Sequence, residues 1–463
     1  MLRLFKQYYP VRNAIFVFGE GIFIFLSVVI ACLLIIGSDQ VHFDPPLLLK
    51  VLLITITCQA CLYYNDLYDL QITDTLSELG IRLLQALGAA AILLALFYFL
   101  FPDFIIGEGI FIVSIAFVFL LIIAWRIGYT QILNKGLFNQ KIMIMGSSDT
   151  AHEIANEIQQ KKDCGYEIAS VLSDKPWEVW PCSSNAGMIC QNHFDNVCDL
   201  AKQMRVDKIV VALKEKRGTL PVKELLKCRV DGIDILEGNT FYEMLTGKLI
   251  VEQINPAWLI FSEGFQKTKA QKLIKRTVDL VLSAAMLIVL MPLILLVAIV
   301  IKLDSKGPAI FSQERVGRHH KPYMVHKFRS MRSDAEKETG PVWAQDNDNR
   351  ITRVGHFIRK WRIDELPQLW NVIKGQMSFV GPRPEREHFV KQLEEIIPYY
   401  GERFSVKPGL TGWAQVSYGY GASVEDAIEK LNYDLFYIKN MSILMDIMIV
   451  ARTVKTVLFG RGR

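Results

Sequence analysis

Four long apolar runs occupy the first part of the chain and limit most strongly what it can fold into. They cover residues 14–36, 47–64, 83–101 and 109–125. An α-helix needs about 20 apolar residues to cross the hydrocarbon core of a bilayer, and each run is close to that length. The runs therefore predict a four-helix transmembrane bundle within residues 1–135. A hydrophobic share of 51% over 463 residues agrees with a chain that lies partly in lipid.

Basic residues predict how this bundle is oriented. Lys and Arg stand before the first run and after the fourth, whereas the connecting segments 37–46 and 102–108 contain neither. Positive charge accumulates on the cytoplasmic side of membrane proteins, so both ends of the bundle are expected in the cytoplasm. Glu20 lies within the first run, where we expect packing or an interhelical hydrogen bond. The eight cysteines show no disulfide framework, which agrees with a reducing compartment.

Residues 136–264 have the pattern of an α/β domain. Strand-like segments such as KIMIMG and DKIVVAL alternate with amphipathic helices, which predicts a parallel sheet. Gly146 begins the turn after the first strand, where a dinucleotide fingerprint would lie, but Ser148 stands in place of the second glycine. That glycine lets the backbone approach a pyrophosphate. We therefore expect a degenerate Rossmann-like scaffold without tight dinucleotide binding.

A fifth apolar run, at residues 278–301, has features that oppose a simple membrane crossing. Basic residues flank it on both sides, namely Lys272, Lys275, Arg276, Lys302 and Lys306. Both flanks are therefore expected on the cytoplasmic side. Pro292 lies within the run, where it removes a helix hydrogen bond and bends the helix. A re-entrant membrane helix over residues 273–302 satisfies both observations, and a straight spanning helix is the alternative.

The segment that follows this run concentrates cationic side chains, namely Arg315, Arg318, Lys321, Lys327, Arg329 and Arg332. In YMVHKFRSM the alternation predicts a strand with Lys327 and Arg329 on one face. Arg and Lys are the side chains that bind phosphate oxygens. A basic surface that faces a membrane is a compatible interpretation. We do not expect nucleic acid as a partner, because no nucleic-acid-binding motif is present.

Asp364 and Glu365 are adjacent carboxylates within an arginine-rich segment, RKWRIDELPQLWNVIKGQMSFVGPRPE. Taken by itself, the pair predicts a helix cap at Asp364, before a first turn that contains Pro367, and an exposed Glu365. Neighbouring cations keep carboxylates ionised, and an ionised Asp is a usable nucleophile toward phosphorus. An adjacent Glu can hold Mg²⁺ together with substrate phosphates. The GPRP turn aims Arg383.

From about Lys272 to the C-terminus, the chain resembles the bacterial sugar transferases, which are polyprenyl-phosphate glycosyl-1-phosphate (phosphoglycosyl) transferases. The motifs that carry the resemblance are KRTVDLVLS, LDSKGPAIFSQERVGR, KFRSMR, DELPQLWNVIKGQMSFVGPRPE and VKPGLTGWAQVSYGYG. The helical N-terminus and the α/β middle are similar to the larger members. FYEMLTGKLIVEQINPAWLIFSEGF and the C-terminal YGYGASVEDAIEKLNYDLFYIKNMS resemble the subgroup that serves exopolysaccharide systems accompanying exosortase sorting.

The resemblance implies an α+β catalytic domain over residues 265–463. It implies that Asp364 attacks the β-phosphorus of a UDP-sugar, expels UMP and passes the sugar phosphate to undecaprenyl (polyprenyl) phosphate. Glu365 would coordinate Mg²⁺ as the cofactor. We assign phosphate binding to Lys327, Arg329, Arg353 and Arg383, and secondary roles to Arg315, Gln415 and Asp434. The family usually has Ser before the kink proline, and this chain has Met291 there.

The expected location is the bacterial inner membrane, with several membrane helices and the catalytic domain on the cytoplasmic face. By family analogy the sugar is glucose or galactose. The extra helical and α/β parts suggest assembly or regulation, for which a homodimer is one form. Two alternatives stay open: a nucleotide-sugar-modifying enzyme in the α/β middle, which requires tight NAD(P) binding, and a non-catalytic scaffold of a polysaccharide assembly complex.

Overall fold

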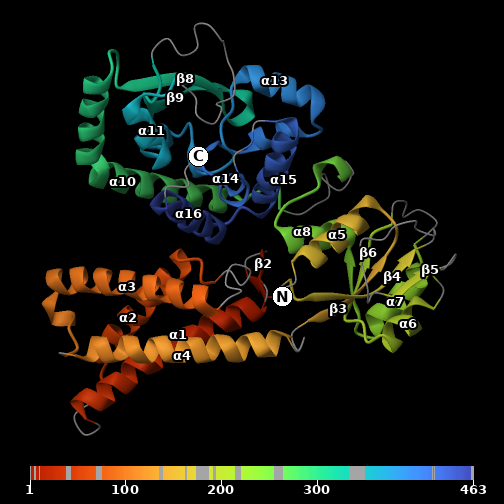
Figure 1. Cartoon of the computed structure of the whole chain (residues 1–463). Helices are drawn as coiled ribbons and strands as arrows, with labels where there is room; N and C mark the ends of the chain where they lie inside the picture. The colour runs from red at the N-terminus through yellow and green to blue at the C-terminus, as the bar shows by residue number, and fades with distance from the viewer. Residues whose placement is uncertain are drawn as a thin grey trace. The chain divides into compact units, whose positions relative to one another are not determined.

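The computed structural model describes most of the chain. The described residues are 2–4, 7–9, 11–37, 43–68, 76–107, 109–134, 139–161, 164–173, 187–190, 194, 196–213, 220–254, 264–332, 350–419, 421 and 423–459. The chain divides into two compact units, Met1–Gly238 and Asn239–Arg463. Figure 1 shows the helices and strands of both.

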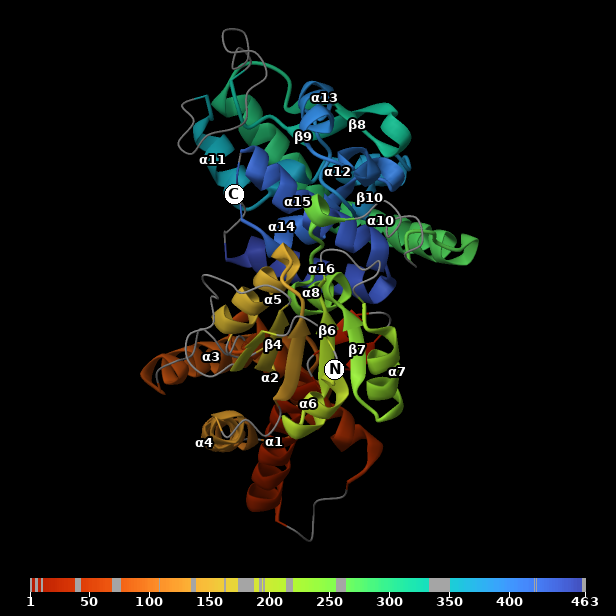
Figure 2. The same ribbon diagram turned by 90° about the vertical axis from the view of Figure 1, so that its right-hand side faces the viewer.

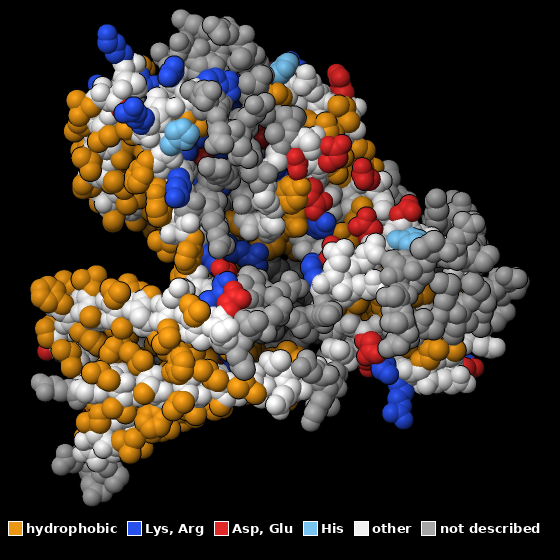
Figure 3. All heavy atoms as spheres, viewed as in Figure 1, with side chains coloured by type: hydrophobic (Ala, Val, Ile, Leu, Met, Phe, Trp, Pro, Cys, Tyr) orange, Lys and Arg blue, Asp and Glu red, His pale blue; other side chains and the backbone are white. Residues whose placement is uncertain are grey.

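Four long helices form the first part of the N-terminal unit. They are α1 (Val11–Ile36), α2 (Pro45–Tyr64), α3 (Leu76–Leu100) and α4 (Ile110–Asn134), and a short hairpin of β1 (Leu2–Leu4) and β2 (Gln7–Tyr9) precedes them. All four helices are long and apolar enough to cross a membrane. Figure 3 shows hydrophobic side chains gathered along their outer surface. The predicted transmembrane bundle is confirmed as an apolar helical bundle.

Glu20 and Arg126 join the first and last helices of the bundle. Arg126 Nε donates to Glu20 Oε1 at 2.6 Å, and Arg126 Nη1 donates to the carbonyl of Leu67. Both charged side chains are buried, which is costly in lipid unless they pair with each other. The interhelical hydrogen bond that we predicted for Glu20 is therefore present, and it ties α1 to α4.

The second part of the N-terminal unit is a parallel sheet. Its strands are β3 (Gln140–Met145), β4 (Tyr166–Ser173), β5 (Gly187–Cys190), β6 (Lys208–Val211) and β7 (Asp234–Glu237), in the order β5-β4-β3-β6-β7. Its helices are α5 (Asp149–Gln160), α6 (Val197–Gln203) and α7 (Val222–Val230). α7 lies beside β7 at one edge (Figure 2). The parallel α/β sheet is as predicted, although the strand patterns of β5 and β7 were not recognised.

The turn after β3 shows why a glycine is needed at its first position. Gly146 has φ of 117°, and a Cβ there would collide with the carbonyl of Ala212 at the end of β6. Ser148 caps α5, because its side chain accepts a hydrogen bond from the Ala151 amide. Gly146 thus serves strand packing, and the turn by itself gives no reason to invoke a dinucleotide.

The C-terminal unit begins earlier than we predicted. Contacts divide the chain after Gly238, whereas the sequence placed the boundary at residue 264. Leu249, Val251 and Ile254 lie in the hydrophobic core of the C-terminal unit. Asn432 Oδ1 also accepts from the Val251 amide at 2.9 Å. The segment 239–254 therefore packs with the C-terminal domain, because its apolar side chains find their core there.

The C-terminal unit is an α+β domain built around short strand pairs. β8 (Ile310–Val316) and β9 (Pro322–Phe328) form an antiparallel hairpin, and β10 (Ser378–Val380) pairs in parallel with β11 (Gly409–Thr411). Helices surround them, namely α8 (Gly238–Thr246), α10 (Lys269–Asp304), α11 (Arg353–Lys360), α12 (Gln368–Ile373), α13 (Glu387–Ile396), α14 (Trp413–Ser417), α15 (Val424–Asn440) and α16 (Ile443–Leu458).

Both halves of the apolar helix α10 pack on this same unit. On the N-terminal side, Asp279 accepts hydrogen bonds from Ser378 Oγ and the Phe379 amide. On the C-terminal side, Val297 and Ile301 belong to a core cluster with Phe328 of β9. The ribbon of α10, which contains Pro292, changes direction between the two halves (Figure 1). By length and composition, α10 could also cross a membrane.

Candidate active site

Asp364 and Glu365 lie in η4 (Ile363–Glu365), a short 3-10 turn between α11 and α12. Arg362 precedes them with φ of 52°, a left-handed conformation that changes the direction of the chain after the end of α11 at Lys360. α12 starts after Pro367 without a side-chain cap. The helix cap that we predicted for Asp364 is therefore wrong, as is the exposed Glu365. Both side chains are buried, at 9% and 7% exposure, because the turn folds them inward.

Three cations surround the carboxylate of Glu365. Its Oε1 accepts from Arg383 Nη2 at 2.9 Å and from Lys327 Nζ at 3.2 Å. Arg362 Nη1 lies 3.7 Å from its Oε2. Burial would raise the pKa of Glu365, but Arg383, Lys327 and Arg362 together hold it well below its usual range. Glu365 is therefore an anion that positions the cations of this site.

Asp364 has the opposite environment. Within the described part of the chain, its carboxylate accepts no hydrogen bond and forms no ion pair. Burial, reinforced by the negative charge of Glu365, raises the pKa of Asp364 to about 6, against the pull of Lys327, Arg359 and Arg383. At neutral pH it is a mostly ionised carboxylate without a fixed partner, which is what a nucleophile requires.

Two arginines next to the carboxylates have unused donors. Arg359 Nη1 and Arg362 Nε are buried, and neither has a hydrogen-bond partner among the described residues. Buried guanidinium donors are normally paired, so these two suit an incoming anion. From the sequence, both arginines were expected only as neighbouring cations that keep the carboxylates ionised. Their donors could have been recognised only once the turn at Arg362 was known.

Arg383 reaches the cluster from the turn that follows β10. Arg403 supports this turn from behind, because its Nη2 donates both to the carbonyl of Arg383 at 3.0 Å and to Asp434 Oδ2 at 2.8 Å. Arg315 supports it from β8, where Nη1 donates to the carbonyl of Pro384 at 3.3 Å. The secondary residues Arg315 and Asp434 therefore act on the backbone that carries Arg383.

Lys327 is held in the cluster by β9, but the structure places two other predicted phosphate ligands elsewhere. Arg329 lies just beyond β9 and is 6% exposed. It donates to the carbonyls of Ser305 and Lys306, so it caps the C-terminal end of α10. Arg353 is the exposed first residue of α11 and makes no contact with the carboxylates. These hydrogen bonds give Arg329 a structural contact with α10, and its phosphate role stays a prediction.

Gln415, the remaining secondary residue, lies in α14. Both amide atoms of its side chain are buried, and neither has a hydrogen-bond partner within the described residues. Its Oε1 lies 3.4 Å from the position that a Cβ on Gly412 would occupy. Gly412 in turn packs against Gly381, the first residue of the GPRP turn that carries Arg383. Gln415 is therefore a neighbour of this turn and forms no hydrogen bond with the two carboxylates.

The residues at η4 fit a magnesium ion only in a limited way. No group of three or more acidic, His or Cys side chains that could hold a metal occurs among the described residues. Glu365 Oε2, which accepts no short hydrogen bond, and the unpaired Asp364 are the available oxygens. Mg²⁺ in enzymes often takes one or two carboxylates and receives its other ligands from water and substrate phosphates. The site thus fits an ion that arrives with a diphosphate.

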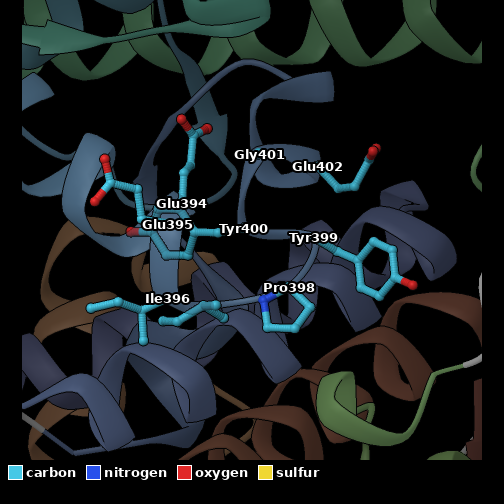
Figure 4. Close-up of a pocket in the computed structure, with 9 residues that line it drawn as sticks. Glu394, Glu395, Ile396, Pro398, Tyr399, Tyr400, Gly401 and Glu402 are labelled. Atoms are coloured by element: carbon cyan, nitrogen blue, oxygen red, sulfur yellow. The ribbon is translucent and has the colours of Figure 1, made fainter.

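A hollow of about 410 Å³ lies away from this cluster, between α13 and η5 (Tyr400–Ser405) (Figure 4). Glu394, Glu395, Tyr399 and Glu402 are among the residues that line it. None of the residues that we predicted for the site lines this hollow. Its acidic lining would repel a diphosphate, so the hollow is not the candidate active site.

Comparisons with known proteins find matches to two regions of the chain. Residues 270–460 match the family model described as "Bacterial sugar transferase", and residues 64–236 match one described as "CoA-binding domain". The chain is 41% identical to an Aeromonas hydrophila protein, a UDP-N-acetylgalactosamine-undecaprenyl-phosphate N-acetylgalactosaminephosphotransferase, over 51% of this chain and 55% of that one. The match thus spans little more than half of that relative.

Two further relatives are similar over larger shares of their own lengths. One is a UDP-glucose:undecaprenyl-phosphate glucose-1-phosphate transferase of Escherichia coli (strain K12), 32% identical over 71% of this chain and 70% of that protein. The other is an exopolysaccharide production protein, PSS, of Rhizobium leguminosarum bv. phaseoli. It is 42% identical over 41% of this chain and 98% of its own length.

Proposed function

Because the chain belongs to the bacterial sugar transferase family, we propose that it transfers a sugar 1-phosphate from a UDP-sugar to undecaprenyl phosphate and releases UMP. The relatives that carry this activity in their names support the reaction class. Relatives named for glucose and for N-acetylgalactosamine both occur, so the sugar is left open between them. The name of the PSS relative supports a role in exopolysaccharide production.

The carboxylate of Asp364 is the nucleophile in this proposal. One of its oxygens attacks the β-phosphorus of the UDP-sugar, and the bond from that phosphorus to the bridging oxygen breaks, so that UMP leaves. The sugar phosphate is then bound covalently to Asp364. An oxygen of undecaprenyl phosphate attacks the same phosphorus, the bond to Asp364 breaks, and undecaprenyl diphosphate-sugar is released.

The observation that carries this assignment is the contrast between the adjacent carboxylates. Glu365 is held by Arg383 and Lys327, whereas Asp364 is buried, unpaired and mostly ionised at neutral pH. Fixed donors that surround a reacting phosphate stabilise charge as it develops. Lys327, Arg383 and the unused donors of Arg359 and Arg362 supply such positive charge beside Asp364. Mg²⁺ bound with the diphosphate would neutralise further negative charge.

The membrane arrangement supports the meeting of two unlike substrates. Both halves of α10 pack on the catalytic unit, so we infer that this helix enters one leaflet and returns. A polyprenyl phosphate presents its head at the membrane surface, and a UDP-sugar is water-soluble. A domain anchored in the cytoplasmic leaflet of the inner membrane can bind the UDP-sugar and then the polyprenyl phosphate at the same nucleophile.

The reaction is tested with the purified full-length protein, undecaprenyl phosphate, Mg²⁺ and a panel of UDP-sugars. We expect UMP release with at least one UDP-sugar, and a mass increase of one sugar phosphate on the peptide that contains Asp364 when undecaprenyl phosphate is omitted. No UMP release with any UDP-sugar would contradict the reaction. Release of UMP without a covalent adduct on Asp364, even under rapid quench, would contradict the mechanism.

The membrane arrangement has its own test. Lys272 and Lys302 are exposed on either side of the apolar part of α10. Cysteines introduced at these positions, in a chain without its native cysteines, are expected to react with an impermeant maleimide from the same side of the membrane. Reaction from opposite sides would show that α10 spans the membrane.

A catalytic α/β sheet is the competing function. It requires tight binding of NAD(P), for which the turn from Gly146 to Ser148 lacks the glycine pattern. Substitution Ser147→Ala is therefore expected to leave UMP release unchanged. NAD(P) released from the denatured purified protein would favour the competing function.

A further inference from the structure

Two cationic groups converge at the base of α10. Arg276 Nη2 lies 3.4 Å, and Lys407 Nζ 3.6 Å, from the point that a Cβ on Gly375 would occupy. Gly375 has φ of 81° and follows α12. The absence of a side chain at this glycine leaves the two positive groups facing one shared space. We call these groups, with the neighbouring Arg318, the Lys407 patch.

The positive charge of this patch is not neutralised by the protein. Lys407 makes no hydrogen bond or ion pair in the part of the chain that the structure describes. Arg276 donates to the carbonyls of Val372 at 2.6 Å and Ile373 at 2.8 Å, which fixes its guanidinium but leaves its charge. Arg318 donates likewise to a carbonyl, that of Ser405 at 3.1 Å.

One acid, Asp279, acts on the patch, but it is occupied. Its Oδ2 accepts from Ser378 Oγ at 2.7 Å and its Oδ1 from the Phe379 amide at 3.1 Å. Burial, then Arg276 and Arg318, lower the pKa of the Lys407 amine against the opposing pull of Asp279. The cations therefore outnumber the acid around Lys407, and an added anion would relieve their repulsion.

The patch lies where α10 passes from water to lipid. Lys269 and Lys272 are exposed at the start of the helix, whereas Val278 and Val281, immediately after Arg276, are exposed apolar side chains. The change from basic to apolar surface marks the level of lipid headgroups. Trp370 of α12, five residues before Gly375 in the chain, is 50% exposed. Lys374 Nζ lies 5.6 Å from the centre of its ring. Half-exposed Trp side chains are enriched at that same level.

We propose that Arg276 and Lys407 bind the phosphate of an anionic phospholipid headgroup, beside the point where α10 enters the membrane. The fixed guanidinium charge of Arg276 together with the point charge of the Lys407 amine suits a phosphodiester. The position of the patch beside the apolar surface of α10 favours a lipid over a soluble anion as the source of the phosphate. The bound lipid would hold the base of α10 against the bilayer.

This site is separate from the Asp364 cluster. The charged groups that act on Lys407 are Arg276, Asp279 and Arg318, and none of them contacts Asp364 or Glu365. Lipid binding at Lys407 therefore does not depend on the sugar-phosphate transfer. Failure of the transfer reaction would leave this inference intact, and the reverse also holds.

The test counts phospholipids that stay bound to the full-length protein in detergent, by native mass spectrometry. The probes are palmitoyl-oleoyl phosphatidylglycerol and, as a neutral reference, palmitoyl-oleoyl phosphatidylcholine. We expect the wild type to prefer phosphatidylglycerol. Lys407→Gln should weaken its tightest phosphatidylglycerol site about fivefold, since one basic side chain near a membrane contributes about 1 kcal/mol. Lys407→Arg, which keeps the charge, should bind within about twofold of the wild type.

Lys302 provides the matched control, because it is exposed at the other end of the apolar part of α10. Lys302→Gln should bind phosphatidylglycerol as the wild type does. An equal loss in Lys302→Gln and Lys407→Gln would overturn the site in favour of diffuse attraction, and so would wild-type binding by Lys407→Gln. Displacement of the lipid by millimolar inorganic phosphate, or by undecaprenyl phosphate at equimolar amounts, would overturn the assignment to bulk phospholipid. Should Lys407→Gln not fold, Arg318→Gln tests the same patch and should weaken the site about twofold.

Discussion

Asp364 in the η4 turn and Asp434 in α15 are two buried carboxylates of one domain. They differ in whether a basic side chain pairs with them. Their exposed fractions are 9% and 2%, and burial raises the pKa of each to about 6. Asp434 accepts a hydrogen bond from Arg403 at 2.8 Å, whereas Asp364 has no fixed partner among the described residues. Burial and a raised pKa alone therefore do not mark a reactive group, and the missing partner does.

The two regions are nevertheless connected. Arg403, which pairs with Asp434, also donates to the carbonyl of Arg383, and the Arg383 side chain holds Glu365 next to Asp364. The Asp434 region is thus a support for the turn that brings Arg383 to the site. Substitutions in the two regions should separate chemistry from support.

The largest difference is expected in the transfer rate. Asp364→Asn keeps the size of the side chain but removes the attacking oxygen anion, so UMP release should fall by about 10⁴-fold or more. Asp434→Asn should reduce it only about tenfold, through displacement of Arg383. The measurement is UMP release under single-turnover conditions. Equal losses in both variants would remove the distinction between the two regions.

The order is reversed for stability. Asp434→Asn leaves Arg403 buried without its counter-charge, which should cost about 3 kcal/mol of the free energy of unfolding of the C-terminal domain. Asp364→Asn removes a buried charge that has no partner, so the thermal midpoint should stay the same or rise. Thermal unfolding in detergent measures both. A lower midpoint for Asp364→Asn would indicate a structural pairing of this residue.

The pH dependence of transfer provides a smaller effect. The attacking form of Asp364 is its carboxylate, so the rate should fall about tenfold for each pH unit below about 6 and level off above it. For stability the sign is opposite. A folded-state pKa above the unfolded value means that the native state binds more protons between about pH 4 and 6, so this group stabilises the fold as the pH falls. A transfer rate that stays constant from pH 7 to pH 5 would contradict the raised pKa.

The smallest effect is expected at Arg353. Its exposed side chain at the start of α11 makes no contact with the carboxylates, so Arg353→Gln should change UMP release by less than about twofold. Lys327→Gln removes a group that contacts Glu365 at 3.2 Å and should reduce the rate about 10²-fold. Equal effects of the two substitutions would show that general positive charge, and not placement at the site, supports transfer.

Much of the fold could be predicted because it follows from local patterns. The apolar runs indicated α1 to α4 and α10, and the strand-like KIMIMG and DKIVVAL indicated β3 and β6. The short strands β5 and β7 were missed, because four residues carry too little periodicity. The boundary at residue 264 was misplaced since the segment 239–254 finds its core in residues far along the chain.

The candidate site could be predicted in part, because some of its residues also lie in local sequence motifs. Adjacent Asp364 and Glu365, Lys327 and the GPRP turn with Arg383 are visible as motifs, and the structure brings them together. Arg329 shares the strand alternation of Lys327, but alternation does not say what lies opposite a side chain. In the structure the C-terminal end of α10 lies opposite Arg329, and the Ser305 carbonyl accepts a hydrogen bond from its guanidinium.

The sequence by itself determined the chemical types of the groups and the lipid contact of the apolar helices, because both depend on side-chain chemistry and on local periodicity. Only the tertiary structure decided which charges meet. The left-handed turn at Arg362 buries both carboxylates. Lys327 reaches Glu365 from β9 and Arg383 reaches it from the turn after β10, while Asp364 is left without a partner among the described residues. Pairing of buried charges depends on distances of a few ångströms between segments that are far apart in the chain, and no local pattern contains those distances.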